Sequence, residues 1–302
     1  MAALQDKVIV ITGAGRGLGL AYARHAAAQG AVVVVNDVDE DAARSTAAEI
    51  TARGGRASAS GHSVSEPDAA AALIEAAVSG HGRLDGLVNN AGLRPEGAAW
   101  DETPAGIRQA VEVNLLGTLF CGLAAMKIMR GQGGGSIVNA SSRAQRGIPS
   151  SATYAATKGA VASLTYAWAI DLHGSGVRVN AIAPQAGGTG TRRRSAPAPP
   201  HEPAAAQMAP LVSYLLSDLS AGVTGQVIRI GGRRDALSVG LMTHPRNGPF
   251  LRRPDGWTVA SLAAAFDTTL GPALEPVGAD GLDVAYQLID GTRVIRSRDD
   301  RL

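Results

Sequence analysis

The sequence contains a single cysteine, Cys121, so an intramolecular disulfide bond is excluded. Cys121 lies in the apolar run LLGTLFCGLAAMKIM, which is typical of core packing, and a lone cysteine fits a reducing compartment. The N-terminal segment lacks a basic stretch followed by a hydrophobic region, and the run VIVIT is far too short to cross a bilayer. We therefore expect a cytoplasmic protein with no membrane partner.

The sequence also lacks a strong excess of charge of either sign, because its 28 basic and 26 acidic residues leave a net charge of only +2. This balance gives no electrostatic reason to expect a nucleic acid partner. The six histidines show neither an HExxH motif nor Cys/His ligand spacing, so no metal site is expected. Small-molecule chemistry is the function class that these absences leave.

The 302 residues suffice for one large α/β domain with a buried core. Strand-like runs alternate with alanine-rich helical stretches, and no internal repeat is visible. The strand-like runs are KVIVIT (7–12), AVVVVND (31–37), LDGLVNNAG (84–92) and SIVNASS (136–142). This order predicts a doubly wound parallel sheet of the Rossmann type, in one domain that covers residues 1–232. Residues 233–302 would form a C-terminal extension of unknown role.

Local signals mark two helix starts. Asp39 precedes the helical stretch Glu40–Ile50, and Ser65 stands three residues before Asp68, at the spacing of a capping box. Both residues are therefore predicted to cap the N-termini of helices.

The stretch Thr191–Ala206 contains four prolines and three adjacent arginines, which predicts a loop. The arginines would be either a solvated basic run or contacts for an anionic substrate. After the loop we expect a helix over Pro210–Ser217 and a strand over Gln226–Ile230. Within the extension, Thr258–Phe266 is a candidate short helix that would pack on the core or on a neighbouring subunit.

The first chemical motif is TGAGRGLG, at residues 12–19, where a predicted strand meets a predicted helix. Its glycines would let the backbone approach a phosphate group, and the helix N-terminus would hold a pyrophosphate. The spacing is GxxxGxG, which differs from the common GxGxxG dinucleotide fingerprint. The expected cofactor contacts in this turn are Gly13, Arg16, Gly17, Leu18 and Gly19.

The choice between two cofactors rests on Asp37 and Arg16. Asp37 follows the second predicted strand, where an acidic side chain bonds both hydroxyls of an adenosine ribose and repels a 2′-phosphate. Arg16 is a cation that would accommodate the same phosphate. We predict NAD(H) from Asp37, and NADP(H) stays an alternative. A simpler interpretation of Asp37 is an acid at a helix start.

Tyr154 and Lys158 are the second motif, four residues apart on one face of a predicted helix. A cation beside a phenol favours the phenolate and lowers the pKa of the tyrosine from about 10. Such a tyrosine is a workable proton donor and acceptor.

With these motifs in this order, the chain resembles the short-chain dehydrogenase/reductase family over residues 7–232. The resemblance implies that Tyr154 is the general acid/base and that Lys158 tunes its pKa and binds the nicotinamide ribose. Asn114 would anchor a proton-relay water. The segment NNAG, which includes Asn90, Ala91 and Gly92, would follow the fourth strand and run beside the cofactor.

The catalytic serine of this resemblance is ambiguous. Alignment of the strand SIVNASS selects Ser142, whereas the usual separation from the tyrosine selects Ser141. We prefer Ser142, because the loop that follows absorbs a one-residue deletion more easily than the strand does. Its hydroxyl would bond the substrate carbonyl oxygen.

Three further cofactor contacts are predicted in segments where the sequence differs from the family pattern. Val64 follows a serine where many relatives have an aspartate, and would contact adenine through its backbone. Pro184 is followed by glutamine instead of glycine, and Thr189 stands at the spacing of a threonine that contacts the nicotinamide carboxamide.

The predicted reaction is hydride transfer between NAD(H) and a secondary alcohol or ketone, such as a hydroxyacyl thioester or a steroid-like alcohol. The resemblance also implies a homodimer or homotetramer. Two other functions stay open: a non-catalytic cofactor-binding regulatory or scaffold protein, and a sugar-nucleotide epimerase or dehydratase.

Overall fold

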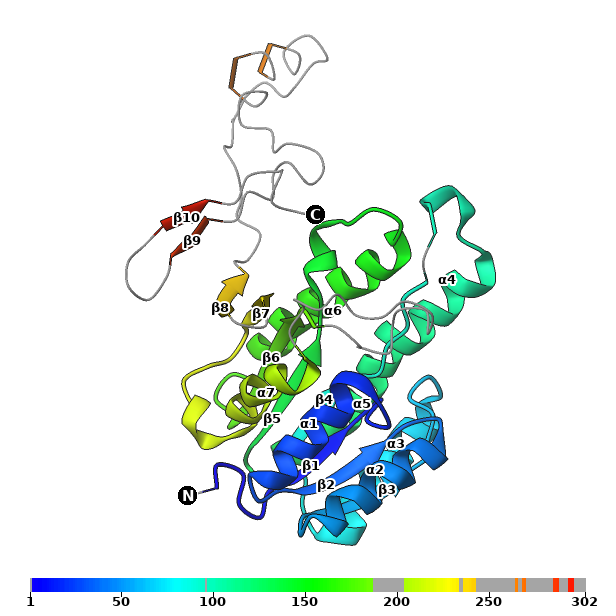
Figure 1. The fold of residues 1–302 in the computed structure, drawn as a ribbon, viewed down its shortest axis with the longest axis vertical. Coiled ribbons are helices and arrows are strands. Elements are labelled where there is room, and N and C mark those ends of the chain that lie inside the picture. Colours follow the sequence, from blue (N-terminus) through cyan, green and yellow to red (C-terminus); the bar gives the residue numbers. More distant parts are fainter. Residues whose placement is uncertain are drawn as a thin grey trace. The chain divides into compact units, whose positions relative to one another are not determined.

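The computed structural model describes residues 2–95, 97–186, 204–233 and 236–242, together with the short pieces 264–265, 268–269, 285–287 and 293–295. The chain divides into two compact units, Met1–Met242 and Thr243–Leu302. The second unit contains a described antiparallel pair, β9 (Ala285–Gln287) and β10 (Arg293–Ile295). The first unit holds the eight-stranded sheet and the helices packed on it (Figure 1).

An eight-stranded sheet forms the centre of the first unit, in the order β3-β2-β1-β4-β5-β6-β7-β8. The first seven strands pair in parallel and β8 is antiparallel to β7. Their bounds are β1 (Val8–Ile11), β2 (Val32–Asn36), β3 (Arg56–Ser60), β4 (Gly86–Asn89), β5 (Gly135–Ala140), β6 (Val177–Pro184), β7 (Val227–Arg233) and β8 (Ala236–Met242). The strand order reverses between β1 and β4, where open α/β sheets bind their ligands. The predicted doubly wound parallel sheet is confirmed.

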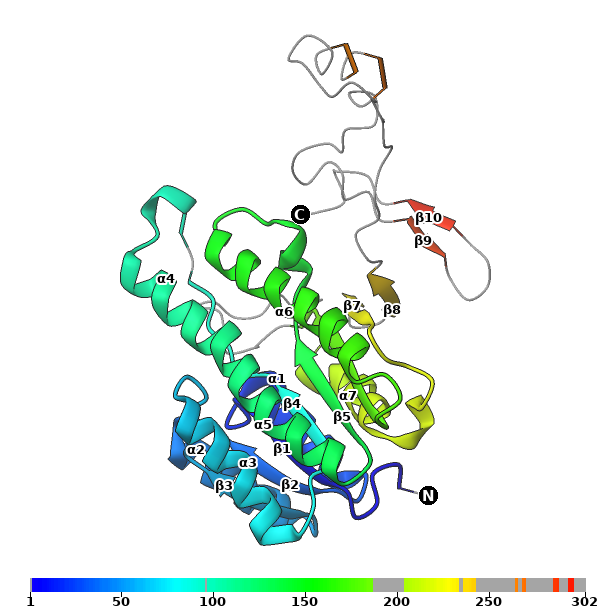
Figure 2. The same ribbon diagram turned by 180° about the vertical axis from the view of Figure 1, so that it is seen from behind.

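Helices cover both faces of this sheet, because its strands are apolar on both sides. One buried cluster joins the sheet to α1 (Gly17–Ala28), α2 (Glu40–Ala52) and α7 (Ala209–Leu216). The other joins it to α3 (Pro67–His81), α5 (Gly117–Gly131) and α6 (Ala152–Asp171). Figure 1 shows α1 and α7 in front of the sheet, and Figure 2 shows α5 and α6 in front of the opposite face.

The two predicted helix caps have different outcomes. The Asp39 side chain accepts a hydrogen bond from the backbone N–H of Ala42 and caps α2, as predicted. Ser65 is not a cap, because α3 begins at Pro67, whose ring presets the first helical turn. The Ser65 hydroxyl instead bonds the hydroxyl of Ser63 at 2.8 Å.

Among the described helices, the continuous stretch Pro104–Gly131 is long and apolar enough to cross a membrane, by length and composition alone. It comprises α4 (Pro104–Val111), a π-helical turn η2 (Glu112–Leu116) and α5. Its Cys121 and Met129 are completely buried in the core, as predicted for Cys121, and burial raises the pKa of that thiol to about 12. A core helix passes the same test of length and composition, so this stretch is weak evidence for a membrane.

The C-terminal part of the sheet extends past Gly232, the expected end of the domain, because β8 continues to Met242. The predicted helix and strand of this part are present as α7 and β7. Of the predicted loop over Thr191–Ala206, residues 191–203 lie outside the described residues. Of its last three residues, Ala204 directly precedes a 3-10 helix, Ala205–Met208, and the other two belong to it. The candidate helix over Thr258–Phe266 lies outside them too, apart from two helical alanines, Ala264 and Ala265.

Candidate active site

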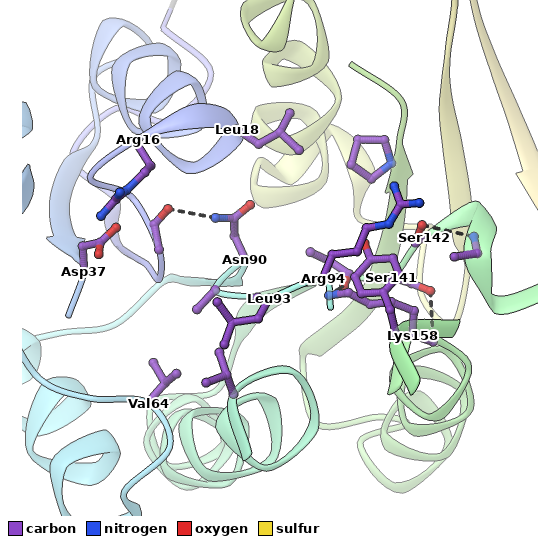
Figure 3. A pocket seen from close by; sticks show the side chains of 18 of the residues that line it. Arg16, Leu18, Asp37, Val64, Asn90, Leu93, Arg94, Ser141, Ser142 and Lys158 are labelled. Atoms are coloured by element: carbon purple, nitrogen blue, oxygen red, sulfur yellow. Dashed lines mark hydrogen bonds between the residues drawn. The ribbon is translucent and has the colours of Figure 1, made fainter. Parts of the chain in front are cut away.

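A cleft of about 700 Å³ opens at the carboxyl ends of the parallel strands, within the size range of cofactor and ligand pockets. Its walls come from segments far apart in the sequence. In Figure 3, Arg16 and Asp37 lie at one end of the cleft, and Ser142 and Lys158 lie at the other. The predicted contacts that line it are Gly13, Arg16, Leu18, Asp37, Val64, Asn90, Ala91, Gly92, Ser142, Tyr154, Lys158 and Pro184.

The glycine turn has the conformation that its residue types require. Gly13 and Gly17 have φ values of +61° and +57°, in the region that favours glycine. A side chain on Gly19 would collide with the carbonyl oxygen of Gly13, so this glycine lets α1 pack closely on the turn. The first turn of α1 holds no acidic residue, which leaves its N–H groups suited to a phosphate.

Hydrogen bonds from the NNAG segment hold the glycine turn against the end of β4. The Asn90 side-chain amide donates to the carbonyl oxygens of Thr12 and Gly13 at 2.9 and 3.1 Å. The backbone N–H groups of Asn90 and Ala91 both donate to the Thr12 hydroxyl at 3.0 Å. Toward the neighbouring strand β5, the Asn89 side-chain amide donates to the side-chain oxygen of Asn139 at 2.9 Å. The segment follows the fourth strand and borders the cleft, as the resemblance implied.

Asp37 is buried, with a relative exposure of 7%. One carboxylate oxygen accepts from the backbone N–H of Gly15 at 3.0 Å, and the other accepts from the N–H of Asp39 at 3.1 Å. The cap of α2 is Asp39, so Asp37 is not a helix-start acid. Arg16 is paired with Asp39 at 2.9 Å, and both side chains of this pair are about half exposed.

Lys158 is buried near the start of α6, with a relative exposure of 4%. Its Nζ donates to the carbonyl oxygen of Ala140, at the end of β5, over 2.6 Å. Burial lowers the pKa of Lys158 to about 8. The ammonium lies 5.7 Å from the centre of the Tyr154 ring, so the predicted pair is assembled.

The pKa of Tyr154 is raised, which differs from the sequence-based expectation of a lowered value. Burial of the phenol is the largest cause, because it disfavours the charged phenolate. A hydrogen bond from Ser142 and the positive charge of Arg94 act in the opposite direction. The sequence expectation rested on the Lys158 charge, whereas burial of the phenol, which depends on the fold, is the largest cause of the shift in the pKa of Tyr154.

The two serines at the end of β5 have different surroundings. Ser142 is partly exposed in the cleft, forms the hydrogen bond to Tyr154, and accepts from the Ala144 N–H at 3.1 Å. Ser141 also borders the cleft, but it is buried and donates to the carbonyl oxygen of Lys158 at 2.9 Å. Ser142 is therefore the serine whose hydroxyl meets the Tyr154 phenol.

Asn114 lies in the π-helical turn, completely buried and behind the residues that line the cleft. Its side chain accepts from the Leu93 N–H at 2.7 Å, and it donates to the Leu93 carbonyl and to the Thr157 hydroxyl. These bonds join the segment after β4 to α6. The role of Asn114 as the anchor of a proton-relay water stays a prediction.

Two further predicted contacts, Val64 and Pro184, lie at the walls of the cleft. Val64 packs against Gly117, where an added side chain would approach it to 2.8 Å. Pro184 ends β6 at the cleft, and Thr189 lies outside the described residues. Sequence reasoning missed Arg94, two residues after the NNAG segment, because no spacing rule marks it.

A doubly wound sheet, a glycine turn on a helix N-terminus and a Ser–Tyr–Lys group in one cleft are the features of a dinucleotide-binding oxidoreductase. The short chain dehydrogenase family model matches residues 7–199. The chain therefore belongs to the short-chain dehydrogenase family.

Individual relatives agree with this assignment. The chain is 42% identical over 184 residues to the short-chain reductase protein NovJ of Streptomyces niveus, covering 61% of this chain and 70% of the relative. It is 36% identical over 251 residues to 2-(S)-hydroxypropyl-CoM dehydrogenase 3 of Xanthobacter autotrophicus, covering 78% and 98%. A crystal structure of a short chain dehydrogenase from Mycobacterium avium superposes with a TM-score of 0.81 at 34% identity, over 91% of this chain and 98% of that one.

Proposed function

We propose that the protein is an NAD(H)-dependent enzyme that interconverts a secondary alcohol and a ketone. The observation that carries this proposal is the meeting of Ser142, Tyr154 and Lys158 at one end of a cleft whose other end holds Asp37. A relative named for a hydroxypropyl substrate adds support for an alcohol. When bound, the nicotinamide supplies or accepts the hydride.

The residues of this chain would move the proton and hold the oxygen. Tyr154 takes the hydroxyl proton from an alcohol, or gives a proton to the oxygen of a ketone. Ser142 donates a hydrogen bond to the same oxygen, which gains negative charge as the ketone is reduced. Lys158 would bind the nicotinamide ribose, and its cation near the phenol favours the ionised form of Tyr154.

Two observations favour NAD(H) over NADP(H). The Asp37 carboxylate lines the cleft, where its negative charge would oppose a 2′-phosphate. Arg16, the cation that would bind this phosphate, is already paired with Asp39. A phosphate would have to compete with that carboxylate for the guanidinium.

Cofactor binding tests this choice. We expect NADH to bind at least about 10-fold more tightly than NADPH, and Asp37→Asn to narrow that ratio because it removes the charge but keeps an acceptor for the Gly15 N–H. Asp41→Asn is the matched control, since Asp41 is an exposed acid at the start of α2. Tighter binding of NADPH by the parent protein, lost in Arg16→Met, would assign the cofactor to NADP(H).

Turnover tests the chemistry. The parent protein should reduce NAD⁺ in step with oxidation of a secondary alcohol, and Tyr154→Phe should remove this activity while NADH binding persists. Full activity in Tyr154→Phe would refute the assignment of the general acid/base. Tight cofactor binding without turnover of any alcohol or ketone would favour a scaffold protein, and product formation without net cofactor reduction would favour an epimerase.

We also propose a homodimer or homotetramer. Leu123 on α5 and Ile170 on α6 expose 48% and 74% of their surface, and both helices cover the same face of the sheet. A contiguous apolar patch on one face is typical of a surface that associates, and these two side chains would belong to such a patch. Light scattering on the purified protein checks this, and a monomer at micromolar concentration would refute it.

A further inference from the structure

Arg94 lies at the catalytic end of the cleft. Its guanidinium carbon is 5.8 Å from the centre of the Tyr154 ring, about as close as the Lys158 ammonium. Its Nε donates to the hydroxyl of Ser151 at 3.2 Å, and Ser151 is itself buried. In Figure 3, Arg94 lies beside Ser142 and Lys158 and borders the open space of the cleft. The guanidinium is thus held in place next to the reactive phenol.

Within the described part of the chain, no carboxylate neutralises this guanidinium. The ion pairs of the described residues include Arg16 with Asp39 at the other end of the cleft, but none of them involves Arg94. The bond to Ser151 uses Nε alone, so the two terminal nitrogens have no acceptor among these residues. Those nitrogens form the planar fork that matches a carboxylate.

A structural role alone accounts poorly for this arrangement. Stacking on the Tyr154 ring is worth only about 0.5–1 kcal/mol at a partly exposed site. Of the described residues that line the cleft, the acidic ones do not offset the charge, since Asp37 is bound by two backbone N–H groups and Glu112 forms no ion pair with Arg94. The catalytic end therefore presents the cations Arg94 and Lys158 to whatever binds there, and Arg143, directly after Ser142, also lines the cleft.

From this geometry we infer that Arg94 binds a carboxylate of the substrate, so the secondary alcohol is a hydroxy acid. The inference deepens the proposed function and rests on it. A substrate whose hydroxyl meets Tyr154 and Ser142 has its other carbon atoms beside Arg94. A carboxylate there would gain charge-assisted hydrogen bonds that a neutral alcohol lacks.

Matched substrates test the inference. The parent protein is assayed with 4-hydroxycyclohexanecarboxylate and its carboxamide, and with 3-hydroxybutanoate and its amide, since each pair differs in charge but hardly in shape. We expect a higher kcat/KM for the acid in at least one pair. In Arg94→Met, kcat/KM for the acid should fall about 10- to 100-fold because KM rises, whereas kcat/KM for the amide should change little. Arg94→Lys should restore part of the loss.

Two controls separate substrate binding from other effects. Arg130→Met removes one exposed charge at the C-terminal end of α5 and should leave kcat/KM unchanged for both the acid and the amide. Because Arg94 lowers the pKa of Tyr154, Arg94→Met should move the acid limb of the pH–rate profile for alcohol oxidation to higher pH for both members of a pair. The comparison is therefore made on the plateau of each profile.

Binding without turnover gives an independent measurement. Cyclohexanecarboxylate should bind the NADH-loaded protein, measured by nicotinamide fluorescence, more tightly than cyclohexanecarboxamide does, and Arg94→Met should remove the difference. Equal losses for acid and amide in Arg94→Met, or a parent protein that prefers the amides, would refute the inference and leave the proposed function standing. Failure to oxidise any alcohol despite cofactor binding would refute the proposed function, and the inference with it.

Discussion

Replacement of Lys158 by methionine should make the cofactor-free protein more stable at neutral pH. The lysine is almost completely buried, its Nζ is bound to the Ala140 carbonyl, and no described carboxylate forms an ion pair with it. Burial lowers its pKa from 10.5 to about 8. At about 1.4 kcal/mol per pH unit, the charged form therefore costs the folded state about 3 kcal/mol.

The pH dependence has a definite sign. Between pH 8 and 10.5 the unfolded chain keeps the Lys158 proton and the folded protein has lost it, so the stability of the parent protein rises with pH in this window. Below about pH 8 both states are protonated, and the full cost of the buried charge remains. Methionine has a similar length but no charge, and its only loss is the bond to Ala140, worth about 1–2 kcal/mol.

Urea denaturation of both proteins between pH 7 and 10 measures this difference. The Lys158→Met variant should be the more stable protein by about 1–2 kcal/mol at pH 7, and this advantage should disappear by about pH 10. Groups other than Lys158 titrate in both proteins, so their contributions to the free energy of unfolding cancel when the variant is compared with the parent. A stability difference that stays constant from pH 7 to 10 would show that Lys158 is not a desolvated cation.

Three shorter predictions follow. Ser142→Ala should lower kcat about 100-fold as well as removing the cap on the Ala144 N–H, whereas Ser141→Ala should reduce stability by about 1 kcal/mol with a much smaller effect on kcat; thermal melts and steady-state kinetics separate the two. Gly19→Ala should weaken NADH binding, because its methyl group would collide with Gly13, and unchanged affinity by calorimetry would contradict the close packing. Cys121 should resist a thiol reagent at pH 8 until the protein unfolds, so rapid labelling of the folded protein would contradict its burial.

The fold was largely predictable because apolar strands, helical stretches and glycine turns alternate in a regular order. Both sides of the sheet are covered by helices, so its strands carry continuous apolar runs such as Val32–Val35, which are visible without a structure. β8 was missed because it is an edge strand with exposed Val239 and Leu241, and its sequence lacks a clear signal.

The cleft itself was predictable only in part. Tyr154 and Lys158 share a helix, so their spacing alone places them together. The choice between Ser141 and Ser142 depends on which hydroxyl faces the phenol, which only three-dimensional packing determines. Arg94 belongs to a segment without a regular element, and its approach to Tyr154 follows from the path of the chain after β4.

The Asp37 carboxylate bears on two properties at once: which coenzyme the cleft accepts, and how the glycine turn is held in its conformation. In the proposed function it opposes a 2′-phosphate, and in the structure it accepts hydrogen bonds from the backbone N–H groups of Gly15 and Asp39. A small apolar residue at this position would remove the charge but leave buried donors without acceptors, at about 1–3 kcal/mol for each. During evolution, a change of coenzyme through a small apolar residue at this position would therefore need a second substitution that gives the turn a new acceptor, whereas asparagine would remove the charge and keep an acceptor.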